Sequence, residues 1–371
     1  MNGSLKIQNK FSHKGMLPMK SEKKYELVFG KTFALYNKEE LIKFIEPFKI
    51  RFERNNLDAK GIFQGKKCFD AGCGGGRGTL FMLMNGSEYV TSYDFSEINI
   101  ETTIKNIKDF GFNNIEAKQG SLEHIPYPDE NFDFVWCNGV IMHTANPDKC
   151  LSEISRILKI GGSAWIYVYG SGGVYWYTIN RFRKMMENVD TEKCISALQL
   201  MRYETGYVAE YIDDWFAVYL RTYTKNDFNN RLKELGFENP SPLRFGTNYD
   251  TSHRINTLSQ EEINYMGEGD LRYLIKKQST KKGDNFKISS NEYGSNYEFP
   301  ENIISILEPV FNVLEQVTQN NDLLKIMSAA YIQRELRILL GNQQNFNIEK
   351  YISIINNVIK LINSVNIYPK V

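Results

Sequence analysis

The sequence lacks the features that mark several classes of protein. No apolar run approaches the length of about 18 residues that a membrane-spanning helix needs, and no uninterrupted apolar signal segment stands at the N-terminus. The five cysteines form neither C-x-x-C pairs nor a regular framework, and the four histidines are scattered singly. We therefore predict reduced thiols, no bound metal, no membrane partner and a cytoplasmic location.

An excess of charge of one sign is lacking as well. The 45 basic residues nearly balance the 44 acidic ones, which leaves a net charge of +1. Without a global basic field we expect no nucleic-acid partner. The sequence is instead rich in aromatic residues, which make up 13% of its 371 positions, and it is long enough for one large or two ordinary domains.

The most informative stretch is residues 67–79, where a short apolar run ends in Asp70 and a cluster of glycines follows. The pattern Asp70-x-Gly72-x-Gly74-x-Gly76 is typical of a tight turn in which a Cβ would block the approach of a ligand. The helix expected next offers unpaired N–H groups to a polar ligand. Asp94 ends the next strand-like run, where an acid that binds ribose hydroxyls is expected.

Two classes of cofactor compete for this motif. The dinucleotide fingerprint G-x-G-x-x-G fails because position 77 is Arg where the third glycine is needed, so a dehydrogenase is a distant alternative. An acid inside the motif, Asp70, suits a cationic ligand such as the amino group of a methionyl moiety. A tight turn that binds no ligand is the plain structural alternative.

With the blocks that follow it, the stretch resembles motif I of the class I S-adenosylmethionine-dependent methyltransferases. Tyr93 to Ser96 resembles the second acidic motif of that family, and further matches occur in the family's order at residues 120–126, 131–143 and 153–162. The resemblance covers roughly residues 61–245, about half of the chain. It implies an enzyme that uses S-adenosylmethionine.

The resemblance also implies roles for individual residues. The backbone of residues 72–76 would hold the methionyl part, Asp70 would lie near its amino group, and Asp94 would accept from the ribose hydroxyls. Ser121 stands where the family often has an aspartate that bonds the adenine amino group, so adenine recognition departs from the family there. The cofactor-binding residues that we expect are Asp70, Gly72, Gly74, Gly76, Asp94, Phe95, Ser121, Leu122 and Asn138.

Candidates for chemistry and substrate binding come after the fourth and fifth predicted strands. His143 is the candidate general base, since imidazole titrates near neutral pH; a histidine that only holds its loop is the alternative. Tyr169, Tyr175 and Trp176 could form an aromatic wall for a sulfonium or a substrate ring, and Tyr36 could line the pocket. For each aromatic residue, simple packing is the competing interpretation.

Alternating strand-like and helical stretches predict an α/β fold with a doubly wound, mostly parallel, Rossmann-like sheet of seven strands. We expect an N-terminal helical cap over residues 1–60 and a methyltransferase core over residues 61–260. A lid insertion occupies residues 171–223, with a packing or dimerisation arm as the alternative, and a helical C-terminal extension covers residues 261–371. The expected strands are 67–69, 89–93, 115–119, 132–137, 164–169, 237–245 and one that includes 255–258.

The function that we expect is methylation of an oxygen or nitrogen atom of a small-molecule metabolite or sugar-like intermediate. The partner is then a small-molecule substrate, and a homodimer is a candidate assembly. Two alternatives stay open: a nucleic-acid or protein methyltransferase, and a catalytically silent subunit that binds the cofactor and serves as a scaffold.

Overall fold

The computed structural model describes residues 24–247, 265–279, 299, 301–341 and 346–365. Within them, one sheet of six strands has the spatial order β3-β2-β1-β4-β5-β6. Strands β1 to β5 run parallel and β6 runs antiparallel to β5. The order reverses between β1 and β4, which is the doubly wound arrangement that we predicted. The strands are β1 (Lys67–Ala71), β2 (Tyr89–Asp94), β3 (Ile115–Gln119), β4 (Phe132–Asn138), β5 (Leu158–Tyr169) and β6 (Asp270–Lys276).

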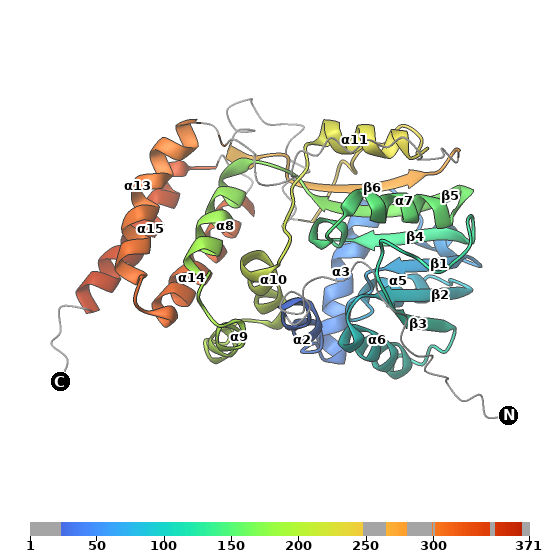
Figure 1. Ribbon diagram of the computed structural model, residues 1–371, viewed down its shortest axis with the longest axis horizontal. Helices are drawn as coiled ribbons and strands as arrows, with labels where there is room; N and C mark the ends of the chain where they lie inside the picture. The colour runs from blue at the N-terminus through green and yellow to red at the C-terminus, as the bar shows by residue number, and fades with distance from the viewer. Residues whose placement is uncertain (1–23, 248–264, 280–298, 300, 342–345, 366–371) are drawn as a thin grey trace.

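Helices cover both faces of this sheet (Figure 1). Successive side chains of β4 point to opposite faces, so Phe134 joins one buried layer and Val135 the other. The first layer is completed by α3 (Lys38–Arg54), α4 (Ala59–Phe63), α5 (Arg77–Met84) and α6 (Glu97–Asp109), and the second by α7 (Pro147–Ile157) and α11 (Lys225–Glu234). Because both faces are buried, the central strands read as nearly continuous apolar runs.

The helix starts are fixed by capping side chains. The Oδ1 atom of Asn37 accepts from the backbone N–H of Glu40, whose carboxylate accepts from the N–H of Asn37, each at 2.9 Å. This reciprocal pair is a capping box at the start of α3, and its residues stand three positions apart in the sequence. The hydroxyls of Ser96 and Thr224 accept from the backbone N–H groups of Asn99 and Asp227, so they cap α6 and α11 without the reciprocal bond. Such a cap stabilises a helix by about 1 kcal/mol.

The end of the sheet differs from the prediction. Residues 238–245, expected as a strand, form none, and Phe237 makes only an isolated bridge to Lys277. The expected strand at residues 255–258 lies outside the described residues. The partner of β5 is β6, which begins after residue 260, where we expected the core to end. Its charged ends obscured the strand pattern, because an edge strand keeps polar residues beside water.

A glycine pair lies inside β5. In the sequence, Gly161 and Gly162 are typical of the end of a helix, but α7 ends at Ile157 and β5 starts at the next residue. The pair lies inside β5, beside a shift in register with β4. Gly161 has a φ of +80°, and a Cβ on Gly162 would lie 2.9 Å from the carbonyl oxygen of Asp133. The two glycines therefore form a bulge.

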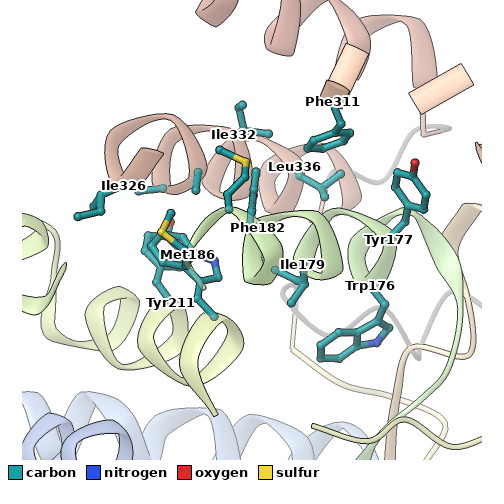
Figure 2. Close-up of a cluster of buried hydrophobic side chains, with 14 of the residues drawn as sticks. Trp176, Tyr177, Ile179, Phe182, Met186, Tyr211, Phe311, Ile326, Ile332 and Leu336 are labelled. Atoms are coloured by element: carbon teal, nitrogen blue, oxygen red, sulfur yellow. The ribbon is translucent and has the colours of Figure 1, made fainter. Parts of the chain in front are cut away.

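The insertion and the C-terminal helices fold together into a helical unit beside the sheet (Figure 1). The C-terminal helices occupy the segments that were expected to be helical. The unit shares one buried core, in which Phe182, Phe311 and Leu336 pack from three different helices (Figure 2). Its helices are α8 (Gly173–Met185), α9 (Thr191–Leu200), α10 (Thr205–Phe216), α13 (Glu301–Thr318), α14 (Asp322–Gly341) and α15 (Ile348–Val365).

A buried polar cluster joins α8, α10 and α14 inside this unit. The hydroxyl of Tyr175 donates to Oδ2 of Asp214 at 2.5 Å, and Nε2 of Gln333 donates to the same oxygen at 2.7 Å. The indole of Trp215 donates to Oε1 of Gln333 at 2.7 Å, and Arg337 donates to the Tyr175 hydroxyl at 2.7 Å. The insertion is therefore joined to the C-terminal helices by directional bonds as well as by apolar packing.

Two kinds of feature are absent from the described residues. No helix among them combines the length and the apolar character that crossing a bilayer requires. Nor do they contain a group of three or more His, Cys, Asp or Glu side chains that could hold a metal ion.

Candidate functional site

A cavity lies at the carboxyl ends of β1, β2 and β4. Its floor consists of the turns that follow these strands. Its roof consists of the helices that precede β1, namely η1 (Glu26–Gly30), α2 (Lys31–Phe33) and α3. Doubly wound sheets bind ligands at this edge, where the strand order reverses. The predicted site residues that line it are Tyr36, Asp70, Gly72, Gly74, Asp94, Asn138 and His143.

The glycine turn after β1 brings bare backbone to the cavity. Gly72 and Gly74 have φ values of +78° and +53°, a region that side chains strain. A Cβ on Gly72 would lie 2.5 Å from the side chain of Val140, and one on Gly74 would lie 3.2 Å from the ring of Phe33. Glycine is therefore required at both positions by conformation and by space.

Asp94 organises the floor beside this turn. Its Oδ2 accepts from the backbone N–H of Gly74 at 2.9 Å, and its Oδ1 accepts from the N–H of Ser96 at 2.9 Å and from Nδ2 of Asn99 at 3.0 Å. Burial raises the pKa of this carboxyl, while these hydrogen bonds lower it. These bonds hold the carboxylate of Asp94, an acceptor for hydroxyl groups, at the wall of the cavity.

Asp70 lies deeper, at the end of β1. Its Oδ2 accepts from the hydroxyl of Thr79 at 2.7 Å, and that hydroxyl lies 2.7 Å from the hydroxyl of Ser92. Burial raises the pKa of Asp70 to about 7, although the bond from Thr79 opposes the shift. A cationic group nearby would favour the ionised form.

Side chains of the roof are aromatic, and hydrogen bonds hold the roof in place. Tyr25, Phe29, Phe33 and Tyr36 all line the cavity, and Tyr36 was predicted to do so. The hydroxyl of Ser96 donates to Glu26 of η1 at 2.6 Å, and the hydroxyl of Thr205 donates to Glu40 of α3 at 2.7 Å. The roof is therefore fixed both to the turn after Asp94 and to α10 of the helical unit.

His143 and Asp213 face one another at the cavity. The Nδ1 atom of His143 lies 2.8 Å from the carbonyl oxygen of Tyr219, so this nitrogen carries the proton and Nε2 is the acceptor of the neutral ring. The Nε2 atom lies 3.4 Å from Oδ1 of Asp213, and neither atom has a hydrogen-bond partner among the described residues. The other oxygen of Asp213 accepts from the hydroxyl of Tyr169 at 2.9 Å.

The two pKa values determine where the proton of this pair lies. Burial lowers the pKa of His143 to about 4, and the charges of Arg183 and Arg221 act in the same direction. Burial raises the pKa of Asp213 to about 7. Below about pH 7 Asp213 therefore keeps its proton. This proton lies between Oδ1 of Asp213 and Nε2 of His143, two acceptors that would otherwise repel each other. As the pH rises through about 7 the pair becomes a proton acceptor.

Several predicted site residues do not line this cavity. They are Gly76, Phe95, Ser121, Leu122, Tyr169, Tyr175 and Trp176. The expected aromatic wall exists as contacts between its members, since Trp176 lies 4.9 Å from Tyr169 and 5.2 Å from Tyr175 between ring centroids. The three rings pack in or against the core of the helical unit. The hydroxyl of Tyr169 donates to Asp213, and the hydroxyl of Tyr175 belongs to the polar cluster.

Two charged residues at the cavity were missed in the sequence. Arg77 was noted only as the residue that breaks the dinucleotide fingerprint, and Asp213 was not noted at all. A usable signal for Asp213 was present, because the acids of the run Tyr211-Ile212-Asp213-Asp214-Trp215 stand among large apolar residues of a helix. Acids in such a position are buried and need partners.

Comparisons with known proteins agree with this geometry. Residues 69–166 match a family described as "Methyltransferase domain". A tRNA U34 carboxymethyltransferase of Campylobacter curvus is 32% identical over 131 residues, which are 32% of this chain and 44% of that protein. A ubiquinone/menaquinone biosynthesis C-methyltransferase of a Shewanella species is 26% identical over 162 residues, which are 42% of this chain and 64% of that protein.

The matches cover parts of both partners. The chain spans 44% and 64% of the length of these two curated relatives. Among solved structures, a SAM-dependent methyltransferase from Aquifex aeolicus is 14% identical with a TM-score of 0.37, over 65% of this chain and 98% of that one. The helical unit lies outside residues 69–166.

Proposed function

Because this chain belongs to the class I S-adenosylmethionine-dependent methyltransferases, we propose that it methylates an oxygen or nitrogen atom of a small-molecule acceptor. The observation that carries this proposal is the His143–Asp213 pair, whose two unpaired polar atoms face one another at the cavity of the glycine turn. A site of this kind can hold the proton that an O–H or N–H acceptor loses.

The residues of the cavity fit the cofactor of this family. When bound, S-adenosylmethionine supplies a methyl group on a positively charged sulfur, which departs as a neutral thioether. The bare backbone at Gly72 and Gly74 permits close approach, and the carboxylate of Asp94 lines the same cavity, where it can accept from a hydroxyl. Asp70 supplies a buried negative charge for a cationic amino group.

The residues of the roof and the His143–Asp213 pair have separate tasks. The aromatic side chains of η1, α2 and α3 exclude water, which strengthens each polar contact inside the cavity. The carbonyl oxygen of Tyr219 fixes the tautomer of His143, so Nε2 is available as the acceptor. The hydroxyl of Tyr169 holds Asp213 against this nitrogen.

A small acceptor is supported by the enclosure of the cavity. The roof is bonded to the floor through Ser96 and Glu26 and to α10 through Thr205 and Glu40, so a long polymer would have to displace it. The nearly neutral charge of the chain, +1, gives no general attraction to nucleic acid.

A second candidate is a nucleic-acid acceptor, favoured by the 32% identity to a tRNA U34 carboxymethyltransferase. This reading predicts binding of RNA that weakens steeply with salt. Titration of total tRNA at about 50 and 200 mM salt tests it, and salt-dependent binding at micromolar affinity would replace the small-molecule proposal.

The experiment for the proposed function is calorimetry with S-adenosylmethionine, S-adenosylhomocysteine and NAD. We expect both adenosyl compounds to bind and NAD not to bind. Asp94→Ala should lower their affinity by about tenfold or more, since a hydrogen bond to a charged group contributes about 1.5–3 kcal/mol. The matched control is Asp109→Ala, an exposed acid at the end of α6. Binding of NAD alone, or of none of the three, would refute the proposal.

Turnover separates an enzyme from a silent scaffold. A screen of phenols, amines and sugar-like alcohols with the labelled methyl donor should give a methylated product. Cofactor binding without any product would favour the scaffold alternative.

A cytoplasmic location also belongs to this proposal, supported by five cysteines that are all unpaired and buried. A homodimer stays a prediction.

A further inference from the structure

The outward side of α14 carries large apolar side chains where a surface helix is normally polar. They repeat at alternating intervals of three and four residues, the spacing of a coiled-coil heptad, which keeps them on one side of the helix. We call this set the α14 stripe: Leu324, Met327, Tyr331, Arg334 and Ile338. Met327, Tyr331 and Ile338 are 45%, 44% and 45% exposed. Apolar side chains gathered in this way mark a site of protein association.

Neighbouring helices of the same unit do not share this feature. Among the described residues, Val313 is the one large apolar side chain that α13 exposes, and Leu361 is the one that α15 exposes. The opposite side of α14 is buried, with Ile326, Ile332 and Leu336 in the cluster of Figure 2. A helix that is apolar on all sides is normally buried on all sides, so the sequence of α14 indicates a partner on its exposed side.

Arg334 is the charged member of the stripe, and its donors are unused. It takes part in none of the hydrogen bonds or ion pairs that join described residues, so its five N–H donors are left to water or to a partner. The carboxylate of Glu335, the next residue, takes part in none either. A partner suited to this face therefore offers apolar side chains and, for Arg334, an aromatic ring or an acid.

A second copy of α14, running in the opposite direction, meets these requirements. The stripe is symmetric about the point between residues 332 and 333, because Met327 and Ile338 are equally far from it. Tyr331 and Arg334 are also equally far from it. A two-fold axis at that point therefore sets Met327 against Ile338 of the other copy, and Arg334 against the ring of its Tyr331. Glu335 lies one helical turn from Tyr331, within reach of the same Arg334. A parallel pair would instead bring the two Arg334 side chains together.

We propose that two copies of this chain dimerise through the α14 stripe, with the two helices antiparallel. Arg334 of each copy stacks on Tyr331 of the other copy and pairs with its Glu335. No residue of the stripe lines the candidate cavity, so this inference does not depend on the proposed function. One helix from each copy forms an interface smaller than the roughly 1,200 Å² of a standard one, and we expect a dissociation constant on the order of 1–10 µM.

Sedimentation velocity between about 0.5 and 100 µM protein tests the association, and the wild type should pass from monomer to dimer over this range. Met327→Glu should raise the dissociation constant by about tenfold or more, because it places a charge against Ile338 of the other copy. Leu361→Glu is the matched control, since Leu361 is 65% exposed on α15, outside the stripe, and it should dimerise as the wild type does. Both variants should melt like the wild type at the lowest concentration, because both positions are exposed.

A charge exchange asks whether the occupant is a second copy. Arg334→Glu should also weaken dimerisation by about tenfold or more, since it removes the ring contact and faces Glu335 of the other copy. Adding Glu335→Arg should restore part of the affinity, because each copy then again offers one charge of each sign. A different protein on this face keeps its own charges, so a double variant without any recovery would overturn the proposal.

Cysteine cross-linking tests the antiparallel register. Positions 327 and 338 are 11 residues apart on one helix, about 16 Å, which is too far for a disulfide within one chain. Met327→Cys combined with Ile338→Cys should therefore give a disulfide-linked dimer on oxidation, whereas neither single variant should, and the five native cysteines are buried. The proposal also fails if the wild type stays monomeric at about 100 µM, if Met327→Glu dimerises unchanged, or if Met327→Cys alone cross-links.

Discussion

At the scale of single residues, the cavity depends on a few polar atoms whose environment differs from water. Asp213 is the clearest example, because its two oxygens have different tasks. One accepts from Tyr169 at 2.9 Å, and the other faces His143 at 3.4 Å without a hydrogen bond. A carboxyl held in this way keeps its proton to a higher pH than an exposed one and can exchange it near neutrality.

The pH profile of methyl transfer should therefore follow Asp213. With the acceptor that the screen identifies, kcat/KM of the wild type should rise as the pH increases through about 7 and then level off, since the pair accepts a proton only after Asp213 has lost its own. Asp213→Asn should remove this rise and lower the rate on the order of 10²-fold. Initial rates between about pH 5.5 and 8.5 measure both effects.

Two controls make the outcome of that experiment specific. His143→Gln should lower the rate as well, because it removes Nε2 as the acceptor. Both variants should bind S-adenosylhomocysteine as the wild type does. An unchanged pH profile in Asp213→Asn would show that the pair does not hold the proton.

At the scale of elements, α10 joins the cavity to the helical unit. Asp213 points to the site, and the next residue, Asp214, points into the polar cluster with Tyr175 and Gln333. Neighbouring helix positions are about 100° apart, so a single helix can serve both partners. Burial raises the pKa of Asp214 to about 8, and the charges of Glu210 and Asp213 add to this shift.

The sign of the resulting pH dependence follows from linkage. Because the folded pKa of Asp214 is raised, the stability that it contributes is complete below its unfolded value of about 4 and is lost as the pH rises to about 8. Asp214→Asn cannot ionise and keeps an oxygen that accepts from Tyr175 and Gln333. We expect its free energy of unfolding, relative to the wild type, to increase by about 1–3 kcal/mol between pH 6 and 8.5.

Urea denaturation at both pH values measures this difference. Asp70 titrates in wild type and variant alike, so comparing the two proteins removes its contribution. The difference that remains belongs to Asp214 together with its charge interaction with Asp213. A difference that stays constant between the two pH values would contradict the assignment.

At the scale of the whole molecule, segments far apart in the chain share one core. Phe182 of the insertion and Phe311 of the C-terminal region are both fully buried, with ring centroids 5.9 Å apart (Figure 2). The insertion therefore cannot be a free flap over the cavity: its inner side is the core of the helical unit. Whether it acts as a lid stays a prediction.

Removing a large side chain from this core should destabilise the molecule strongly. Phe311→Ala should lower the free energy of unfolding by about 3–5 kcal/mol through lost burial and the cavity left behind. Val313→Ala on the same helix is the matched control, because Val313 is 43% exposed and should change stability by about 0.5 kcal/mol or less. Urea denaturation measures both, and equal effects would show that the helical unit is not packed as described.

The sequence by itself determined the features that are encoded over short distances. Asp70 and the glycines after it lie in consecutive positions, and the caps at Asn37 and Ser96 are local patterns, so each could be predicted from its neighbours. The doubly wound, parallel arrangement of β1 to β5 followed from the alternation of strands and helices.

Only the tertiary structure decided which distant segments meet. His143 and Asp213 are far apart in the chain, and their contact depends on how α10 packs beside the sheet. The same holds for β6 beside β5, and for Arg77, whose aromatic partners come from α3. Periodicity records which face of an element is apolar, whereas the choice of partner is made by the packing of complementary surfaces.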